Sequence, residues 1–150
     1  MIASCLNLGA IHEKNDQKKS ESFYHKALKL CQQTGDKNRE AFVYCCLGDL
    51  AAAASDEKNT EALFVKSLEL SRKTGDEEQE ILARIKLIEW FEKQNQKEKA
   101  LECLSVAEVF FRNPKAPLQG KKQRLQKEVE TIRERWLAKA WIPERKEHKS

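Results

Sequence analysis

Hydrophobic residues recur along this chain three and four positions apart, which is the spacing of a helix and not of a strand. Leu82, Ile85 and Ile88, for example, would lie together on one helical face. Short polar segments interrupt the pattern at residues 14–16, 55–56 and 94–96. The pattern therefore predicts three pairs of helices: 2–14 with 17–33, 37–54 with 57–73, and 77–94 with 97–112.

The sequence also repeats itself at an interval of 40 residues, which aligns Thr34-Gly35-Asp36 with Thr74-Gly75-Asp76. Within these triplets, each glycine can adopt the left-handed conformation that ends a helix, and each aspartate can cap the helix that follows. Gln79 comes three residues after Asp76, which is the spacing of a capping box. We therefore expect three repeat units, which span about 1–34, 37–74 and 77–112.

Small residues recur where two helices would approach closely, and larger residues would fill the gaps between them. The small residues are Gly9, Ala27, Gly48, Ser67, Ala100 and Ala107, and the larger ones are Tyr24, Phe64 and Leu104. With Leu8-Gly9 and Leu47-Gly48 in the first helices, this arrangement resembles the tetratricopeptide repeat (TPR) family over residues 1–112. The 40-residue period exceeds the usual period of about 34, and it is similar to the longer repeats of kinesin light chains and Pins-type adaptors.

The resemblance implies an all-α fold, a right-handed α-α superhelix (a TPR-like solenoid) of three helix pairs plus a C-terminal capping helix. Armadillo or HEAT repeats share the period and are the alternative, although they lack the Leu-Gly and Ala pattern. The first predicted helix is apolar over more than half of its circumference, at Met1, Ile2, Cys5, Leu6, Leu8 and Ile11. We expect an upstream repeat, or a second copy of the chain, to cover this N-terminal end.

The composition changes after Phe111, where the prolines of segment 113–117 break the helix. Beyond this break, an apolar stripe is formed by Leu118, Leu125, Val129, Ile132, Trp136 and Ala140. The stripe predicts an amphipathic capping helix over 118–142, which is followed by a predicted disordered tail over 143–150. The other side of this helix is basic, with Lys121, Lys122, Arg124, Lys127, Arg133, Arg135 and Lys139. Residues 112–150 carry 12 basic and 5 acidic residues, whereas residues 1–111 carry 16 and 19.

Composition narrows the classes of function. With 35% charged residues, five glycines and three prolines in 150 residues, the chain favours helices over an all-β fold. No apolar run approaches the roughly 18–20 residues that cross a bilayer. Five cysteines without metal-ligand or disulfide spacing indicate reduced thiols, so we expect the cytoplasm, with the nucleus and the cilium as alternatives. Because catalytic and phosphate-binding motifs are absent, we expect no enzymatic activity, cofactor, metal or small-molecule substrate.

The TPR resemblance implies a non-enzymatic adaptor in which the first helix of each pair lines a concave groove for a partner peptide or helix. The groove-lining candidates are Leu6, Glu13, Phe42, Cys45, Asp49, Ala52, Leu82, Ile85, Lys86, Glu89 and Lys93. Apolar residues beside acids predict an amphipathic or extended peptide that carries some positive charge. By the same resemblance, cytoskeletal, motor or ciliary assemblies are the expected setting.

Chaperone tails and nucleic acids are two other kinds of ligand that can be compared with the sequence. Family members that bind chaperone tails hold a terminal carboxylate with lysines, asparagines and an arginine. The corresponding positions here hold Leu6, Ala10, Cys46, Leu82 and Lys86, so we expect no such binding. The alternative function is nucleic-acid or acidic-surface binding through the basic C-terminal helix, which is less favoured because acids are interspersed and no aromatic platform accompanies the bases.

Overall fold

The helical pattern is realised as seven α-helices in a computed structural model of the protein, which describes residues 1–112 and 120–142. The helices are α1 (Ile2–His12), α2 (Gln17–Thr34), α3 (Lys37–Ala53), α4 (Glu57–Thr74), α5 (Glu77–Lys93), α6 (Lys97–Arg112) and α7 (Lys121–Ala138). No strand occurs in these two ranges, which confirms the all-α class. The first six helices end within two residues of the predicted bounds.

Four of the helices begin at an aspartate whose carboxylate accepts a hydrogen bond from the backbone N–H three residues further on. These are Asp16, Asp36, Asp56 and Asp76, with distances of 3.1, 3.1, 3.3 and 3.2 Å. Gly35 and Gly75 end α2 and α4 with the same left-handed φ of 73°. The Thr-Gly-Asp triplets thus end one helix and begin the next, as predicted.

Only half of the predicted capping box at Gln79 is present: Asp76 accepts from the Gln79 backbone N–H, but the Gln79 side chain does not return to the backbone of Asp76. The Gln79 side chain donates instead to Ser67 Oγ at 3.3 Å and to Cys45 Sγ at 3.4 Å. The backbone N–H of Asp76 donates to the carbonyl oxygen of Ser71 at 3.0 Å, as part of the turn that ends α4. Because that N–H already has an acceptor, the Gln79 amide is available to the buried polar groups between α3 and α4.

Glycine permits close packing in the first two helix pairs. A Cβ atom on Gly9 would lie 2.5 Å from the ring of Tyr24, and one on Gly48 would lie 2.5 Å from the ring of Phe64. The hydroxyl of Ser20 also donates to the carbonyl oxygen of Gly9 at 2.7 Å, across the first pair. These contacts place an aromatic ring directly on the backbone of the facing helix, as the pairing of small and large residues predicted.

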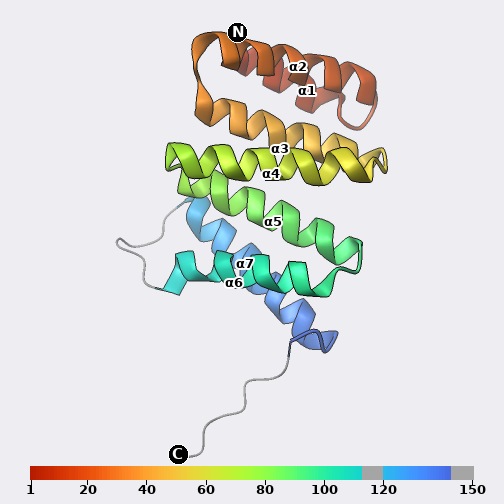
Figure 1. Ribbon diagram of the computed structural model, residues 1–150. Coiled ribbons are helices and arrows are strands. Elements are labelled where there is room, and N and C mark those ends of the chain that lie inside the picture. Colours follow the sequence, from red (N-terminus) through yellow and green to blue (C-terminus); the bar gives the residue numbers. More distant parts are fainter. Residues whose placement is uncertain (113–119, 143–150) are drawn as a thin grey trace, which may run out of the picture.

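Each helix packs against the next one in the chain, and α3 also contacts α5 (Figure 1). The buried side chains form two clusters. One cluster joins α1, α2 and α3 through residues such as Ile2, Tyr24 and Leu47. The other continues from α3 to α7 and includes Phe64 and Trp136. The apolar core therefore follows the order of the helices along the stack.

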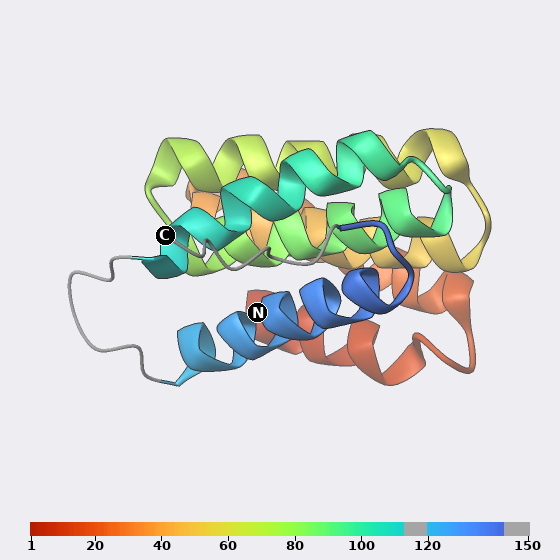
Figure 2. The ribbon, with the colours of Figure 1, turned by 90° about the horizontal axis from the view of Figure 1, so that it is seen from below.

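Helix α7 is shorter than the predicted helix. Leu125, Val129, Ile132 and Trp136 are buried as predicted, and α7 contacts α5 and α6. Ala140 is exposed and lies beyond the helix end, because its φ of 59° belongs to a turn in which the ring of Trp141 lies 5.4 Å from that of Trp136. Seen from below, α7 and α4 lie on opposite sides of the molecule (Figure 2). Leu118 and the predicted break (113–117) and tail (143–150) lie outside the described residues.

The contact between Gly48 and Phe64 generates the first prediction. Substitution Gly48→Ala forces a methyl group against the ring, and overpacking of this kind typically costs about 1–3 kcal/mol. Alanine's higher helix propensity offsets up to about 1 kcal/mol, so we expect a net loss of roughly 1–2 kcal/mol in the free energy of unfolding, measured by urea denaturation.

The matched control is Phe64→Leu, alone and combined with Gly48→Ala, because the third pair carries Ile88 opposite Leu104 at the corresponding positions. The double variant should lose less stability than the sum of the two single variants, since leucine leaves room for the added methyl group. Strict additivity would show that the contact does not limit the helix spacing.

Candidate functional site

Two adjoining hollows lie on the face that the first helix of each pair presents. The larger, the central hollow, has a volume of about 320 Å³ between α1, α3 and α5 and is lined by Leu6, Asn7, Ala10, Glu13, Tyr24, Phe42, Cys45, Cys46, Asp49, Leu82 and Lys86. The smaller, the α5 hollow, has a volume of about 170 Å³ and is lined by Asp49, Ala52, Phe64, Lys86, Glu89, Trp90 and Lys93. Asp49 and Lys86 belong to both, so the two hollows meet at this pair.

The structure brings ten of the eleven predicted groove residues together around these hollows. Leu6, Glu13, Phe42, Cys45, Asp49, Leu82 and Lys86 line the central hollow, and Ala52, Glu89 and Lys93 line the α5 hollow. The remaining residue, Ile85, is only 1% exposed and belongs to the core that includes Leu125 and Val129 of α7. The assignment of Ile85 to an open groove is therefore wrong, because the core that α7 joins buries that side of α5.

Six lining residues are not among the eleven groove candidates given above: Asn7, Ala10, Tyr24, Cys46, Phe64 and Trp90. Tyr24 and Phe64 were expected only to fill the space between helices. They do so, but their rings also reach the edges of the two hollows. The sequence signal for this position is the glycine opposite each ring. A ring that packs on a backbone without a side chain can extend past the facing helix.

Asp49 and Lys86 form an ion pair across α3 and α5, with the carboxylate and Nζ 3.2 Å apart. Loss of hydration in the groove raises the pKa of Asp49 above its ordinary value, and the neighbouring Lys86 only partly opposes this. The same loss of hydration would lower the pKa of Lys86, but the charge and hydrogen bond of Asp49, together with the charge of Glu89, outweigh it, so the pKa of Lys86 is raised. Each charge therefore stabilises the other, and Lys86 is not a free cation.

The remaining charges at the hollows are mainly acidic. The hydroxyl of Tyr24 donates a hydrogen bond to the Glu13 carboxylate, and burial together with this bond raises the pKa of Tyr24. Loss of hydration raises the pKa of Glu89, an effect that Lys86 reduces and Glu128 of α7 increases. A cationic group beside Glu89 would replace lost hydration with an opposite charge, which favours its binding there.

The two cysteines of the central hollow are poorly suited to thiolate chemistry. Burial raises the pKa of Cys45 to about 11 and that of Cys46 to about 12. The Cys45 sulfur lies 3.1 Å from the hydroxyl oxygen of Ser67. Because a thiolate is the reactive form, thiols held in this way act as small apolar groups at neutral pH.

The two histidines that the structure describes, His12 and His25, make separate contacts. His12 stacks on Phe23, with ring centroids 5.8 Å apart, as expected for a packing role, and His25 lies 3.4 Å from Glu21 on the same helix. His148 lies outside the described residues. Within the parts of the chain that the structure describes, no cluster of three or more potential metal ligands is found, and no helix there is long and apolar enough to span a bilayer.

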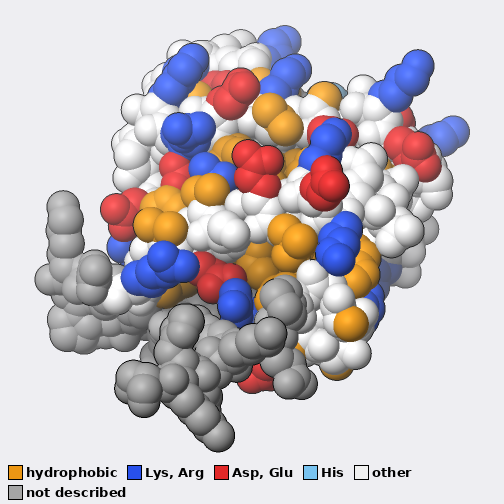
Figure 3. Space-filling view, turned by 60° about the horizontal axis from the view of Figure 1, so that its bottom comes forward, with side chains coloured by type: hydrophobic (Ala, Val, Ile, Leu, Met, Phe, Trp, Pro, Cys, Tyr) orange, Lys and Arg blue, Asp and Glu red, His pale blue; other side chains and the backbone are white. Residues whose placement is uncertain are grey.

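Four of the seven basic side chains predicted for the C-terminal helix are paired with acids of the repeats. Lys122 binds Glu77 at 2.9 Å, Arg133 binds Glu108 at 2.7 Å, and Arg135 and Lys139 both bind Glu92, at 2.9 and 2.8 Å. On the face drawn in Figure 3, acidic and basic side chains are likewise interspersed. This pairing of four of the seven predicted basic residues reduces the positive surface that α7 could offer to an anionic partner.

Comparison with known proteins gives this chain no relative: no protein-family model, no curated protein and no solved structure matches it.

Glu92 provides a test of how α7 is held. Hydrogen bonding by Arg135 lowers the pKa of Glu92 from 4.5 to about 2, and the side chain is only 10% exposed. A lowered pKa in the folded state stabilises the fold above pH 4.5, and this stabilisation disappears as the pH falls towards 2. We expect Glu92→Gln to lose about 1–3 kcal/mol at pH 7, with the difference from wild type shrinking as the pH falls.

The control variant is Glu77→Gln, because Glu77 pairs with Lys122 at the surface and is 61% exposed. Exposed pairs of this kind contribute about 0–1 kcal/mol, so this variant should have little effect. Urea denaturation at a series of pH values measures both. Equal losses for the two variants would contradict a special role for Glu92.

Proposed function

We propose that this chain is a TPR-like helical-repeat module that binds a partner polypeptide along the central and α5 hollows. The observation that carries the proposal is the position of the central hollow, between the first helices of three successive pairs, with an apolar lining and carboxylates at its edge. Support for a repeat module comes from features that recur 40 residues apart, namely the glycine and aspartate caps and the positive φ of 58° at both Ser55 and Asn95.

The lining defines the chemistry of the partner. Leu6, Ala10, Phe42 and Leu82 provide apolar surface, and 320 Å³ lies within the range of side-chain and ligand pockets, which begins at about 300 Å³. Lys86 is neutralised by Asp49, so the remaining charges are the negative Glu13 and Glu89 and the positive Lys93, a net negative charge. A segment with a large apolar residue next to lysine or arginine fits this combination. The role is that of a non-enzymatic adaptor. The reduced thiols are the ground for a cytoplasmic setting, and the TPR resemblance is the ground for a cytoskeletal, motor or ciliary assembly.

Selection of peptides from a random phage-displayed library on the immobilised chain tests the proposal. We expect the selected sequences to pair a large apolar residue with lysine or arginine. Phe42→Lys should weaken the binding of the synthetic peptides at least tenfold in fluorescence anisotropy, because it removes apolar surface and adds repulsion. Glu89→Gln should weaken it by about threefold to tenfold and reduce its dependence on salt.

Val109→Lys is the matched control, since Val109 is 59% exposed on α6 and lines neither hollow. This variant should bind like wild type. Peptides that bind all three variants equally would place the binding surface elsewhere, and peptides without basic residues would overturn the proposed partner chemistry.

The groove should not recognise a terminal carboxylate. Its cationic side chains are Lys86, which Asp49 already neutralises, and Lys93, so the several donors that a desolvated carboxylate needs are missing. Calorimetry with carboxy-terminal chaperone peptides should therefore give no carboxylate-dependent binding. Micromolar binding by the free acid that is lost in the amidated peptide would contradict this reading of the groove.

A further inference from the structure

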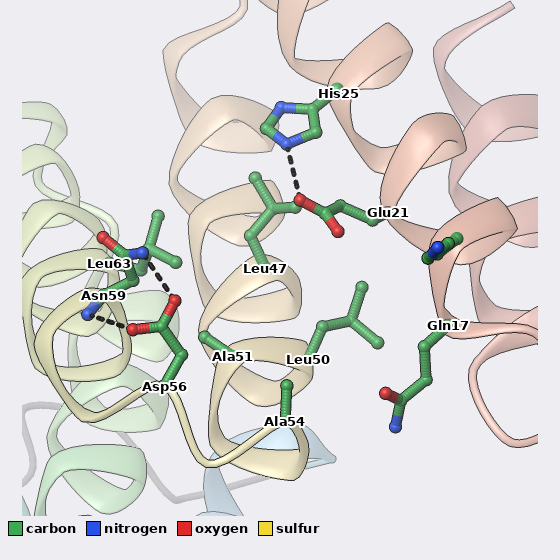
Figure 4. A pocket seen from close by; sticks show the side chains of 11 residues that line it. Gln17, Glu21, His25, Leu47, Leu50, Ala51, Ala54, Asp56, Asn59 and Leu63 are labelled. Atoms are coloured by element: carbon green, nitrogen blue, oxygen red, sulfur yellow. Dashed lines mark hydrogen bonds and ion pairs between the residues drawn. The ribbon is translucent and has the colours of Figure 1, made fainter.

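A third hollow lies on another side of α3 and shares no lining residue with the central hollow. This outer hollow has a volume of about 490 Å³ between α2, α3 and α4. Figure 4 shows Leu47, Leu50 and Ala51 of α3 and Leu63 of α4 around it, with Glu21 and His25 of α2 at its rim. Leu47 and Leu50 are only 5% and 9% exposed, so the floor is apolar and the polar groups lie at the edge.

Comparison of successive repeats shows what this space lacks. The 40-residue shift places Leu50 on Trp90 and Ala51 on Phe91, and both aromatic side chains are buried, at 6% exposure. The Nζ atom of Lys99 lies 5.6 Å from the centre of the Phe91 ring, and Lys99 corresponds to Asn59, which lines the outer hollow. In the later repeat, therefore, the chain supplies an aromatic ring at the position where Ala51 leaves open space.

We infer that the outer hollow binds an aromatic side chain, tryptophan in preference to phenylalanine, that a partner protein presents. The volume and apolar floor fit an aromatic ring, and Phe91 supplies such a ring at the equivalent place within the chain itself. The rim selects the indole. Both carboxylate oxygens of Asp56 already accept hydrogen bonds from Asn59, whereas Glu21 contacts only His25 among the rim residues drawn in Figure 4 and can accept from an indole N–H.

This site is independent of the groove proposed above, because it uses a different side of α3 and a neutral aromatic anchor in place of a basic segment. A partner could occupy it whether or not the central hollow is filled. Large aromatic residues in enclosed pockets dominate the energetics of many protein interfaces, so a single such anchor is a sufficient specificity element.

The probe is N-acetyltryptophanamide, titrated into the ¹⁵N-labelled full chain and followed by amide chemical shifts. We expect saturable shifts concentrated in residues 47–54 and 59–63, with a dissociation constant on the order of millimolar for so small a ligand. N-acetylalaninamide should cause none of these shifts. Nuclear Overhauser contacts should connect the indole ring to the methyl groups of Leu47, Leu50 and Leu63.

The variant Ala51→Phe places the later repeat's own ring in the hollow. It should weaken probe binding at least tenfold and raise the melting temperature by roughly 2–4 °C, because it fills an open apolar space. Ala53→Phe is the matched control, since Ala53 is exposed on the same helix and lines none of the three hollows. It should bind the probe like wild type.

Three results would overturn the inference: absence of saturable shifts in the wild-type chain, shifts that persist unchanged in a folded Ala51→Phe variant, or Overhauser contacts to residues outside the hollow. If Ala51→Phe does not fold, the Overhauser contacts in the wild-type chain decide alone. The groove variant Phe42→Lys should leave probe binding unchanged, so failure here and failure of the proposed function are separate outcomes.

Discussion

The structure depends on the contact of an aromatic ring with a glycine backbone inside each of the first two helix pairs. With Tyr24 against Gly9 and Phe64 against Gly48, the two helices of a pair lie closer together than side chains on both partners would allow. The same rings extend to the edges of the central and α5 hollows. One packing requirement therefore fixes the spacing of each pair and also supplies part of the lining of the two hollows.

Local signals explain why much of this arrangement could be predicted from the sequence. Each Thr-Gly-Asp triplet marks both the end of one helix and the beginning of the next. The bounds of these helices can therefore be predicted without knowing how the helices pack. The groove candidates come from the TPR resemblance, which implies that the first helix of each pair lines one common surface. For that reason residues as far apart as Leu6 and Lys93 were assigned together and lie around adjoining hollows.

The errors concern features that depend on contacts between distant segments. Ile85 is predicted to line the open groove, but the core that it shares with α7 buries it. The residues around Ile85 in the sequence carry no signal for where α7 packs. Gln79 has the spacing of a capping box, but buried partners on α3 and α4 compete for its amide. The outer hollow could not be predicted from the repeated pattern, because it arises from a difference between the repeats. Ala51 lines the hollow, whereas the next repeat has Phe91 at the same position.

This difference between the two repeats extends along the ends of α3 and α5. The α3 segment 51–54 is four alanines, of which Ala51 and Ala54 line the outer hollow and Ala52 lines the α5 hollow. The corresponding α5 segment begins with Phe91, which is buried, and Glu92, which binds Arg135 and Lys139 of α7. Large side chains at the end of α5 are thus used to complete the core and hold the last helix. The small side chains at the same positions of α3 leave open space on two of its sides, namely the outer hollow and the α5 hollow.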